Sequence, residues 1–455
     1  MWDEFAWILI GSGILAFGAS FGIGANDVAN SFSSSIGSNA LNMRQATMIA
    51  SVCEFTGALV MGSTVTKTVR KGIADVEEFE DAPEILMYGM MCVLGAVAMW
   101  LAMATKYGLP VSTTHSTIGA IIGMSIVARG FDSITWGLEL SNEFPYLTGV
   151  SKIVASWLIS PIMSGIVSFI LFYVLKVIIL RRNRSHIKAI YSFPIIVGMT
   201  MSINSYFIIS KGSKREGWNE MYSDYEKMGI SLIIGTISLF ITACFMPFLK
   251  YKIEERSKLY RENSIFELTE KVQDVHDNTE IFDFKTESVF TYCQIFSAMC
   301  SSFAHGANDV ANAIGPFAAV YGIYKTQSVV SESNVDIWVL AIGGVGIVAG
   351  LSLYGINIIK QIGVNLTKIT PTRGLCIELA AAIVVIIGTK YEIPLSTTHC
   401  QIGAIIGVAL HEGTDGINKE LLYKIIFGWI ITLFIAGSTS GLLTAQGIYA
   451  PYNNA

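Results

Sequence analysis

The sequence predicts an all-α polytopic membrane protein, and three observations support this fold class. Only 14% of its 455 residues are charged and 52% are hydrophobic, whereas a soluble domain carries roughly 25% charge. Apolar runs near 20 residues, the length that crosses a bilayer, recur along the whole chain. An internal duplication relates the two halves. We therefore expect about 12 transmembrane segments in two inverted-topology repeats, with broken helices and two re-entrant hairpins.

The candidate spans follow from the apolar runs taken in order. They are Phe5–Ala25, Thr47–Thr66, Ile85–Thr105, Val111–Ala128, Val150–Leu180, Tyr191–Ser210, Met228–Leu249, Val289–Ala307, Ile337–Ile359, Leu375–Thr389, Leu395–His411 and Leu421–Gln446. The fifth run is too long for one straight helix and contains Pro161. The runs that open at Val111 and Leu395 are short, glycine-rich and polar at their start, which favours re-entrant hairpins over plain spans.

Charged loops orient the chain. Residues 181–188 carry four Lys or Arg and residues 250–288 carry seven, and two spans separate these loops. The positive-inside rule places both in the cytoplasm, and the acidic start of the chain then lies outside with the other terminus. The intervening loop 211–227 also carries four basic residues, which weakens the prediction without reversing it. We expect the plasma membrane as the location.

Two motifs occur once in each half, in the same order. Gly24–Asn30 and Gly306–Asn312 both read Gly-Ala-Asn-Asp-Val-Ala-Asn. A Pro-x-Ser-Thr-Thr-His motif follows each copy, and its His lies 88 residues after the first Asp and 90 after the second. The chain enters the first copy from the acidic, external terminus and the second from the basic, cytoplasmic linker, so equivalent helices run in opposite directions. This is an inverted repeat, the architecture of secondary transporters. We expect a first repeat over 1–180, linking spans over 181–249, a cytoplasmic linker over 250–288 and a second repeat over 289–455.

The Pro-x-Ser-Thr-Thr-His motifs predict two helix N-termini that face an anion. Proline tolerates the first turn and hydroxyls cap free N–H groups, while the helix dipole favours negative charge there. Ordinary capping is the alternative for one copy, and the duplication argues against it. The hydroxyls that would bind a tetrahedral oxyanion are Ser112, Thr113, Thr114, Ser396, Thr397 and Thr398.

The Asn-Asp pairs place carboxylate and amide oxygens at membrane depth, where an ionised Asp costs about 2.5–3.5 kcal/mol. Hard oxygens suit sodium, and a carboxylate tolerates an anion when a cation separates them or when the anion is itself a hydrogen-bond donor. This favours phosphate over sulfate. The expected substrate and cation ligands are Asn26, Asp27, Asn308 and Asp309, with Asn30, Asn312, Glu54 and Glu378 as further coupling-ion residues. Glu54 and Glu378 are not equivalent positions in the duplication.

Other classes of function fit less well. His115 and His399 each follow a Ser at i+3, but no Gly-x-Ser-x-Gly elbow accompanies them, so an intramembrane hydrolase is a remote alternative, as is a channel. The three motif histidines (His115, His305 and His399) match no recognised metal spacing. The sequence contains no basic cluster with interleaved aromatic residues, the pattern that would indicate nucleic-acid binding. We expect no enzyme activity and no cofactor beyond co-transported sodium.

The motifs resemble those of the inorganic phosphate transporter family, whose members are sodium- or proton-coupled symporters. The resemblance spans about Phe17–Gly130 and Phe303–His411. It implies phosphate held between broken helices and hairpin tips, with Glu54 and Glu378 where the family has transport-essential glutamates. The string Val69-Arg70-Lys71-Gly72-Ile73 is similar to sodium-coupled members.

The expected function is therefore phosphate import coupled to sodium, by alternating access. Proton coupling and another oxyanion, such as sulfate, remain open as alternatives. The expected partners are phosphate, sodium or protons, and the lipid bilayer, with a homodimer left open.

Overall fold

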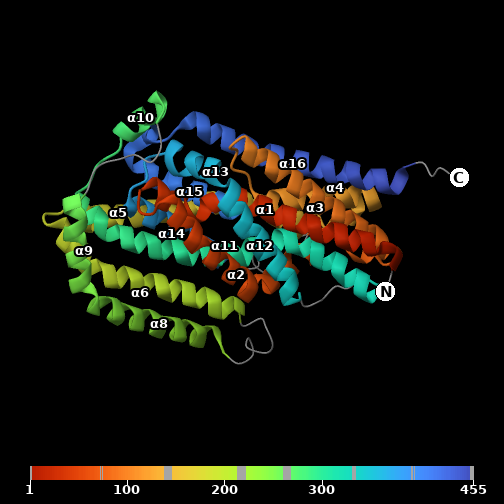
Figure 1. The fold of residues 1–455 in the computed structure, drawn as a ribbon, viewed down its shortest axis with the longest axis horizontal. Helices are drawn as coiled ribbons and strands as arrows, with labels where there is room; N and C mark the ends of the chain where they lie inside the picture. The colour runs from red at the N-terminus through yellow and green to blue at the C-terminus, as the bar shows by residue number, and fades with distance from the viewer. Residues whose placement is uncertain are drawn as a thin grey trace.

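The chain folds into a bundle of long helices (Figure 1). The computed structural model describes residues 3–71, 73, 75–137, 146–212, 222–259, 268–329, 335–390, 393 and 395–450, without the side chains of 28–30, 63–71, 211–212, 256–259 and 389–390. The helices of the first half are α1 (Ala6–Gly37), α2 (Met43–Lys71), α3 (Pro83–Lys106), α4 (Thr113–Arg129), α5 (Gly149–Leu175), α6 (Ser185–Gly212), α8 (Asp224–Cys244) and α9 (Met246–Leu259). Those of the second half are α10 (Glu270–Asp277), α11 (Phe284–Thr326), α12 (Ile337–Tyr354), α13 (Ile356–Lys360), α14 (Pro371–Lys390), α15 (Thr397–Ala409) and α16 (Lys419–Tyr449).

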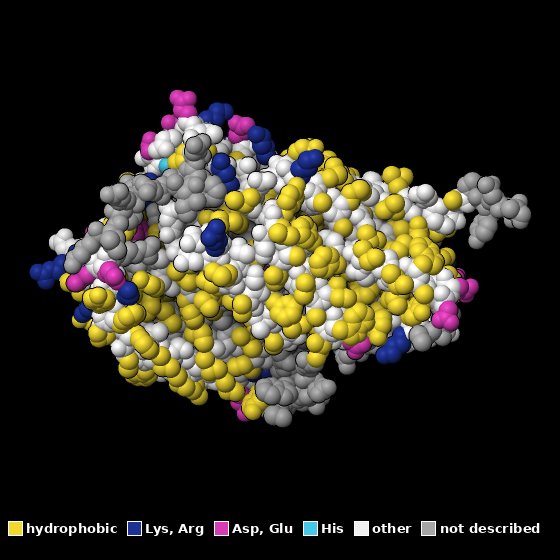
Figure 2. Space-filling model, in the orientation of Figure 1, with side chains coloured by type: hydrophobic (Ala, Val, Ile, Leu, Met, Phe, Trp, Pro, Cys, Tyr) yellow, Lys and Arg dark blue, Asp and Glu magenta, His cyan; other side chains and the backbone are white. Residues whose placement is uncertain are grey.

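Eight helices in the described part of the chain are long and apolar enough to cross a membrane. They are α1, α3, α5, α6, α8, α12, α14 and α16. Hydrophobic side chains cover the flank of the molecule, and charged side chains gather mainly toward the ends of its long axis (Figure 2). The protein is thus an integral membrane protein. The total of 12 spans and the re-entrant hairpins stay predictions, because α2 and α11 are long but polar and α4 and α15 are short.

The two halves interlock by exchanging helices. α1 packs on α12 and α2 packs on α11, so each motif-bearing helix is covered by a helix of the other half. The same exchange recurs further along the chain, where α4 packs on α16 and α15 packs on α5. Each half therefore supplies helices that hold α4 and α15, the two helices that begin in the Pro-x-Ser-Thr-Thr-His motifs.

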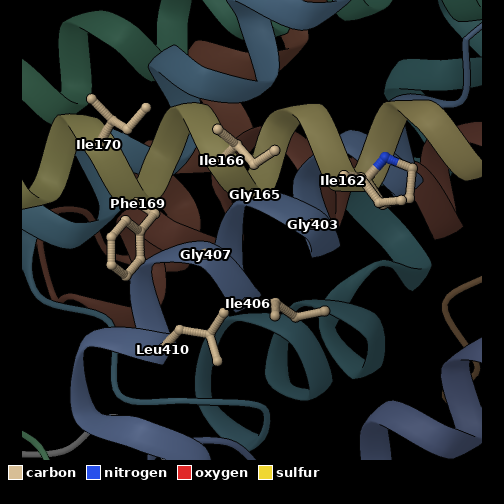
Figure 3. Close-up of a pocket in the computed structure, with 10 residues that line it drawn as sticks. Ile162, Gly165, Ile166, Phe169, Ile170, Gly403, Ile406, Gly407 and Leu410 are labelled. Carbon is tan, nitrogen blue, oxygen red and sulfur yellow. The ribbon is translucent and has the colours of Figure 1, made fainter.

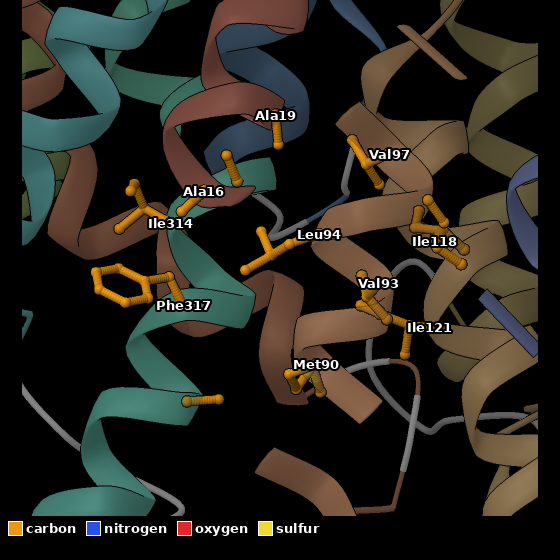
Figure 4. Packing of buried hydrophobic residues seen from close by; sticks show 14 of the residues in the cluster. Ala16, Ala19, Met90, Val93, Leu94, Val97, Ile118, Ile121, Ile314 and Phe317 are labelled. Carbon is orange, nitrogen blue, oxygen red and sulfur yellow. The ribbon is translucent and has the colours of Figure 1, made fainter. Parts of the chain in front are cut away.

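A buried apolar cluster fills the space between α1, α3, α4 and α11 (Figure 4). Ala16 and Ala19 of α1 lie opposite Leu94 of α3, and Phe317 of α11 packs into the same cluster. Because the cluster takes side chains from both halves, neither half completes this core alone. It stabilises the motif helices just beside their polar segments.

The predicted break in each motif helix is wrong. α1 continues for 32 residues and α11 for 43, and both copies of Gly-Ala-Asn-Asp-Val-Ala-Asn are helical throughout. The motif glycines serve close helix contact instead. A Cβ atom on Gly24 would lie 1.9 Å from the carbonyl oxygen of Ile347 on α12, and one on Gly306 would lie 2.2 Å from that of Glu54 on α2.

The segment predicted as a hydrophilic linker, 250–288, is largely helical where the structure describes it. α9 ends at Leu259, α10 covers Glu270–Asp277 and α11 begins at Phe284. α9 and α10 lie at one end of the molecule, whereas α1 begins and α16 ends at the other (Figure 1). The arrangement agrees with a chain whose termini share one side and whose linker lies on the opposite side.

The close contact at Gly24 leads to a stability prediction. Gly24→Ala should lower the free energy of unfolding by about 1–3 kcal/mol, because the added methyl group meets backbone that cannot move aside. Thermal unfolding of the detergent-purified protein measures the effect. The matched control is Gly229→Ala in α8, where a Cβ meets nothing within 4 Å, and which should leave the melting temperature unchanged or higher. Equal melting temperatures for the two variants would contradict the packing role.

Candidate functional site

The helices α4 and α15 begin in the same way, beside the two motif helices. Ser112 is extended and its side-chain oxygen accepts the backbone N–H of His115 at 3.2 Å; Ser396 does the same for His399 at 3.3 Å. Both residues are therefore N-caps, as the sequence predicts. The threonines that follow occupy the first helical turn, at the positive end of each helix dipole.

Asp27 of α1 bridges the two helix N-termini. The hydroxyl of Thr113 on α4 donates to its Oδ2 at 2.7 Å, and the hydroxyl of Thr398 on α15 donates to its Oδ1 at 3.0 Å. The Asp27 side chain is 1% exposed. One buried carboxylate thus bonds to both helix N-termini, and its partner on α15 is 371 residues away in sequence.

Asp309 of α11 occupies the equivalent place in the second half. Its Oδ2 accepts the hydroxyl of Thr397 at 2.9 Å and lies 2.6 Å from Nε2 of His305, and Asn308 donates to its Oδ1 at 3.4 Å. One ligand atom each of Asp27, His305 and Asp309 lie within 4.8 Å of one another. We call these three residues the carboxylate centre. Its oxygens suit sodium, whereas an imidazole nitrogen suits softer metals.

Glu54 of α2 joins the carboxylate centre through His305. The Nδ1 of His305 lies 2.8 Å from Oε2 of Glu54, whose Oε1 accepts hydroxyls from Ser302 at 2.9 Å and Ser31 at 3.3 Å. His305 therefore lies between two carboxylates, and only a doubly protonated imidazole donates to both. His305 has no predicted role from the sequence alone. Its spacing of four residues before Asp309, which places both on one helix face, is the signal that was available.

Glu378 belongs to a different cluster. It lies on α14, and Ser34 and Ser35 of α1 donate to its Oε1, the latter at 3.2 Å. Gln294 and Ser297 of α11 also contact this carboxyl group. The predicted non-equivalence of the two glutamates agrees with the order of the helices. Glu54 lies on α2, directly after the first motif helix, whereas Glu378 lies on α14, directly before the second Pro-x-Ser-Thr-Thr-His copy.

The asparagines of the motifs differ in their contacts. Asn26 is buried, and its side chain binds the segment before α4. Its Nδ2 donates to Thr105 Oγ1 at 3.1 Å and to the carbonyl of Leu109 at 3.0 Å, and its Oδ1 accepts the N–H of Val111 at 2.9 Å. Its partner in the repeat, Asn308, is only partly buried.

Asn312 joins the second motif to α4. It donates to Thr113 at 3.2 Å and to Thr114 at 3.5 Å. The side chains of Asn30 and of residues 69–71 lie outside the described part of the chain, as do residues Gly72 and Pro394.

The site thus consists of two capped helix N-termini and buried carboxylates in the interior of a membrane-spanning bundle, which is the chemistry of a transport protein for a small charged solute. The chain matches the model of the Phosphate transporter family over residues 23–440. It belongs to that family.

Relatives with known names agree. A protein named "Putative phosphate permease" from Thermococcus kodakarensis is 37% identical over 96% of this chain and 97% of its own length. The "Inorganic phosphate transporter 2-1, chloroplastic" of Arabidopsis thaliana is 34% identical over 95% of this chain and 70% of its own length. A solved structure titled "The sodium-dependent phosphate transporter" superposes with a TM-score of 0.79 at 30% identity, covering 96% of this chain and 98% of that one.

The unequal contacts of the two equivalent asparagines lead to a second prediction. Asn26→Ala removes three hydrogen bonds and leaves the N–H of Val111 without its partner, at a cost of about 1–3 kcal/mol for each buried group left unsatisfied. Asn308→Ala removes only the 3.4 Å contact with Asp309. Thermal unfolding in detergent should therefore show a clearly lower melting temperature for Asn26→Ala than for Asn308→Ala. Equal losses would show that Asn26 does not hold the segment before α4.

Proposed function

We propose that this protein imports inorganic phosphate in symport with sodium, by alternating access. The observation that carries the proposal is the pair of capped helix N-termini whose threonine hydroxyls meet two buried carboxylates. Helix N-termini favour an anion and carboxylates favour a cation. A site that holds both next to one another fits a solute pair of opposite charge.

The hydrogen bonds of the threonines indicate an order of binding. Thr113, Thr397 and Thr398 donate their hydroxyl protons to Asp27 and Asp309. A sodium ion that coordinates these carboxylates would reduce their demand for hydrogen bonds and release the hydroxyls for a phosphate oxygen. Sodium would therefore bind first, and phosphate would then join at the first turns of α4 and α15.

The proposed phosphate ligands are the hydroxyls and first-turn N–H groups of the two Ser-Thr-Thr segments, 112–114 and 396–398. The proposed sodium ligands are the carboxylates of Asp27 and Asp309, and the side-chain amide oxygens of Asn308 and Asn312 are proposed as additional ligands. Asn26 positions the segment before α4, because its polar atoms already bind that segment. Glu378 lies apart from the carboxylate centre and is proposed to bind a further coupling ion with Ser34 and Ser35.

The proposed organisation keeps two inverted repeats, over 1–180 and 289–455. The helix exchange between halves supports this, since a repeat related by an in-plane axis pairs equivalent helices reciprocally. The proposed orientation places the termini outside and 250–288 in the cytoplasm of the plasma membrane, by the basic loops at that end. If two sodium ions accompany each H2PO4⁻, one net positive charge enters per cycle, worth about 2.3 kcal/mol per 100 mV.

One observation favours proton coupling as the alternative. The chain of contacts from Glu54 through His305 to Asp309 joins three groups that can each carry a proton. Such a chain could deliver a proton to the carboxylate centre in place of sodium. The two coupling modes share the phosphate site and differ in what neutralises Asp309.

Removing either central carboxylate should stop transport. Asp27→Asn and Asp309→Asn keep the size of the side chain, and each should lower the initial rate of radiolabelled phosphate uptake by about 100-fold or more, since losing about 3 kcal/mol of charged interaction corresponds to about two powers of ten. Asp415→Asn, which removes an exposed pair with Lys419 at 3.6 Å, is the control and should retain uptake. Sodium-driven uptake that survives in both central variants would remove the site assignment.

The coupling ion is tested with reconstituted protein. Phosphate uptake into proteoliposomes should require an inward sodium gradient and should be competed by arsenate but not by sulfate. Uptake driven equally by a proton gradient alone, and lost in His305→Gln, would establish the alternative. Uptake of sulfate under either gradient would overturn the proposed substrate while leaving the fold and membrane assignment intact.

A further inference from the structure

An apolar groove runs along the surface of the bundle where α5 packs on α15 (Figure 3). Its volume is about 370 Å³. Ile162, Ile166 and Phe169 of α5 form one wall. Ile406 of α15 and Leu410, the residue directly after α15, form the other. Every residue that lines the groove is apolar or glycine, so the groove offers dispersion contacts and no hydrogen bonds.

The walls of the groove are accessible from the hydrocarbon region of the membrane. Ile162 is 60% exposed, Ile166 49% and Leu410 47%, and α5 is one of the helices apolar enough to span a bilayer. A groove of this kind in a water-soluble protein would attract a protein partner. Here the surrounding medium is itself made of acyl chains, which match the groove in polarity.

The exposed stripe of the groove continues along α5 to a polar end. Beyond Phe169, the exposed residues Tyr173 and Val177 follow at the spacing of one helix face. The Nε of Arg182, an exposed side chain, donates to the carbonyl of Val177 at 2.8 Å. A guanidinium group is thereby anchored where the apolar stripe ends, with its remaining N–H groups available to an oxyanion.

The charge around Arg182 is positive on balance. Lys176 and Arg181 both pair with Glu280, at 2.7 and 2.9 Å, so one carboxylate faces two cations. The hydrogen bond from Arg181 lowers the pKa of Glu280 to about 2, which keeps that carboxylate ionised at any physiological pH. The described ion pairs of this cluster do not include Arg182, so its charge adds to the excess.

We propose that this groove binds an anionic phospholipid, with one acyl chain lying in the groove over the contact line of α5 and α15 and the phosphate group on Arg182. The apolar channel and the cation at its end match the two chemical halves of such a lipid. A zwitterionic lipid has the same chains but carries a cation beside its phosphate, and binds less well.

The site touches a helix that the proposed function uses. α15 begins at Thr397, and its first turn contacts both central carboxylates. A chain that packs along the same helix against α5 stabilises the position of that first turn. This consequence rests on the proposed function, whereas lipid binding itself does not.

Native mass spectrometry of the detergent-purified protein tests the site, with phosphatidylglycerol or phosphatidylcholine of identical chains added. Arg182→Ala should weaken retention of phosphatidylglycerol by about fivefold, the effect of one basic residue at an anionic lipid surface, with little effect on phosphatidylcholine. Lys188→Ala, which removes an exposed charge from the nearby start of α6, is the matched control and should bind as the native chain does.

A second pair of variants tests the groove. Ile166→Trp fills it, and Leu158→Trp places the same bulk on α5 at a residue that is 67% exposed and outside the groove lining. Ile166→Trp should lose one bound phosphatidylglycerol and Leu158→Trp should keep it; Ile162→Trp replaces the first variant if it does not purify as a single species. Equal lipid binding by the groove and control variants overturns the proposal. A changed ratio of dimer to monomer with unchanged lipid binding also overturns it, and assigns the groove to a second copy of the chain.

Discussion

The structure depends on one buried carboxylate, that of Asp27. A charge in the interior of a membrane protein is tolerated only where partners replace water, and Asp27 finds them in hydroxyls from α4 and α15. These two helices belong to different halves of the chain. The need of the Asp27 carboxylate for hydrogen-bond donors therefore constrains how the halves pack together. Asp309 repeats the arrangement with Thr397 and His305. The carboxylate centre consequently connects the two halves, in addition to its proposed role in binding.

Close backbone packing makes that joint possible. The motif helices remain continuous because their polar side chains find partners on neighbouring helices, and no break in the backbone is needed to supply them. Gly24 and Gly306 bring α12 and α2 against the motif helices at contact distance. This proximity is what places Glu54 beside His305. Glycine, which the sequence assigned to helix breaking, therefore acts here through its small volume, and both motif segments keep a helical backbone.

The sequence predicts much of this architecture because duplication reveals it. Two motifs in constant order predict two equivalent halves, and Pro-x-Ser-Thr-Thr-His predicts capped helix N-termini, which Ser112 and Ser396 form. What it could not predict are contacts between residues far apart in the chain. The bonds of Asn26 to residues about 80 positions away make it a positioning residue, and the separation of Glu378 from Glu54 depends on which helices pack together. No local pattern encodes either.

The charge balance of the centre links its structure to the proposed coupling. With their carboxyl groups ionised, Asp27, Asp309 and Glu54 bring three negative charges, and a doubly protonated His305 brings one positive charge. The net charge on these four residues is then minus two, and it repels phosphate at short range because Coulomb energies are large away from water. Two sodium ions would cancel it, and an arriving H2PO4⁻ would then meet a neutral centre flanked by two positive helix ends. A proton delivered through His305 would neutralise only one carboxylate and leave the centre negative. Within the proposed mechanism, the charge balance therefore calls for two cations per phosphate, whether these are sodium ions or protons.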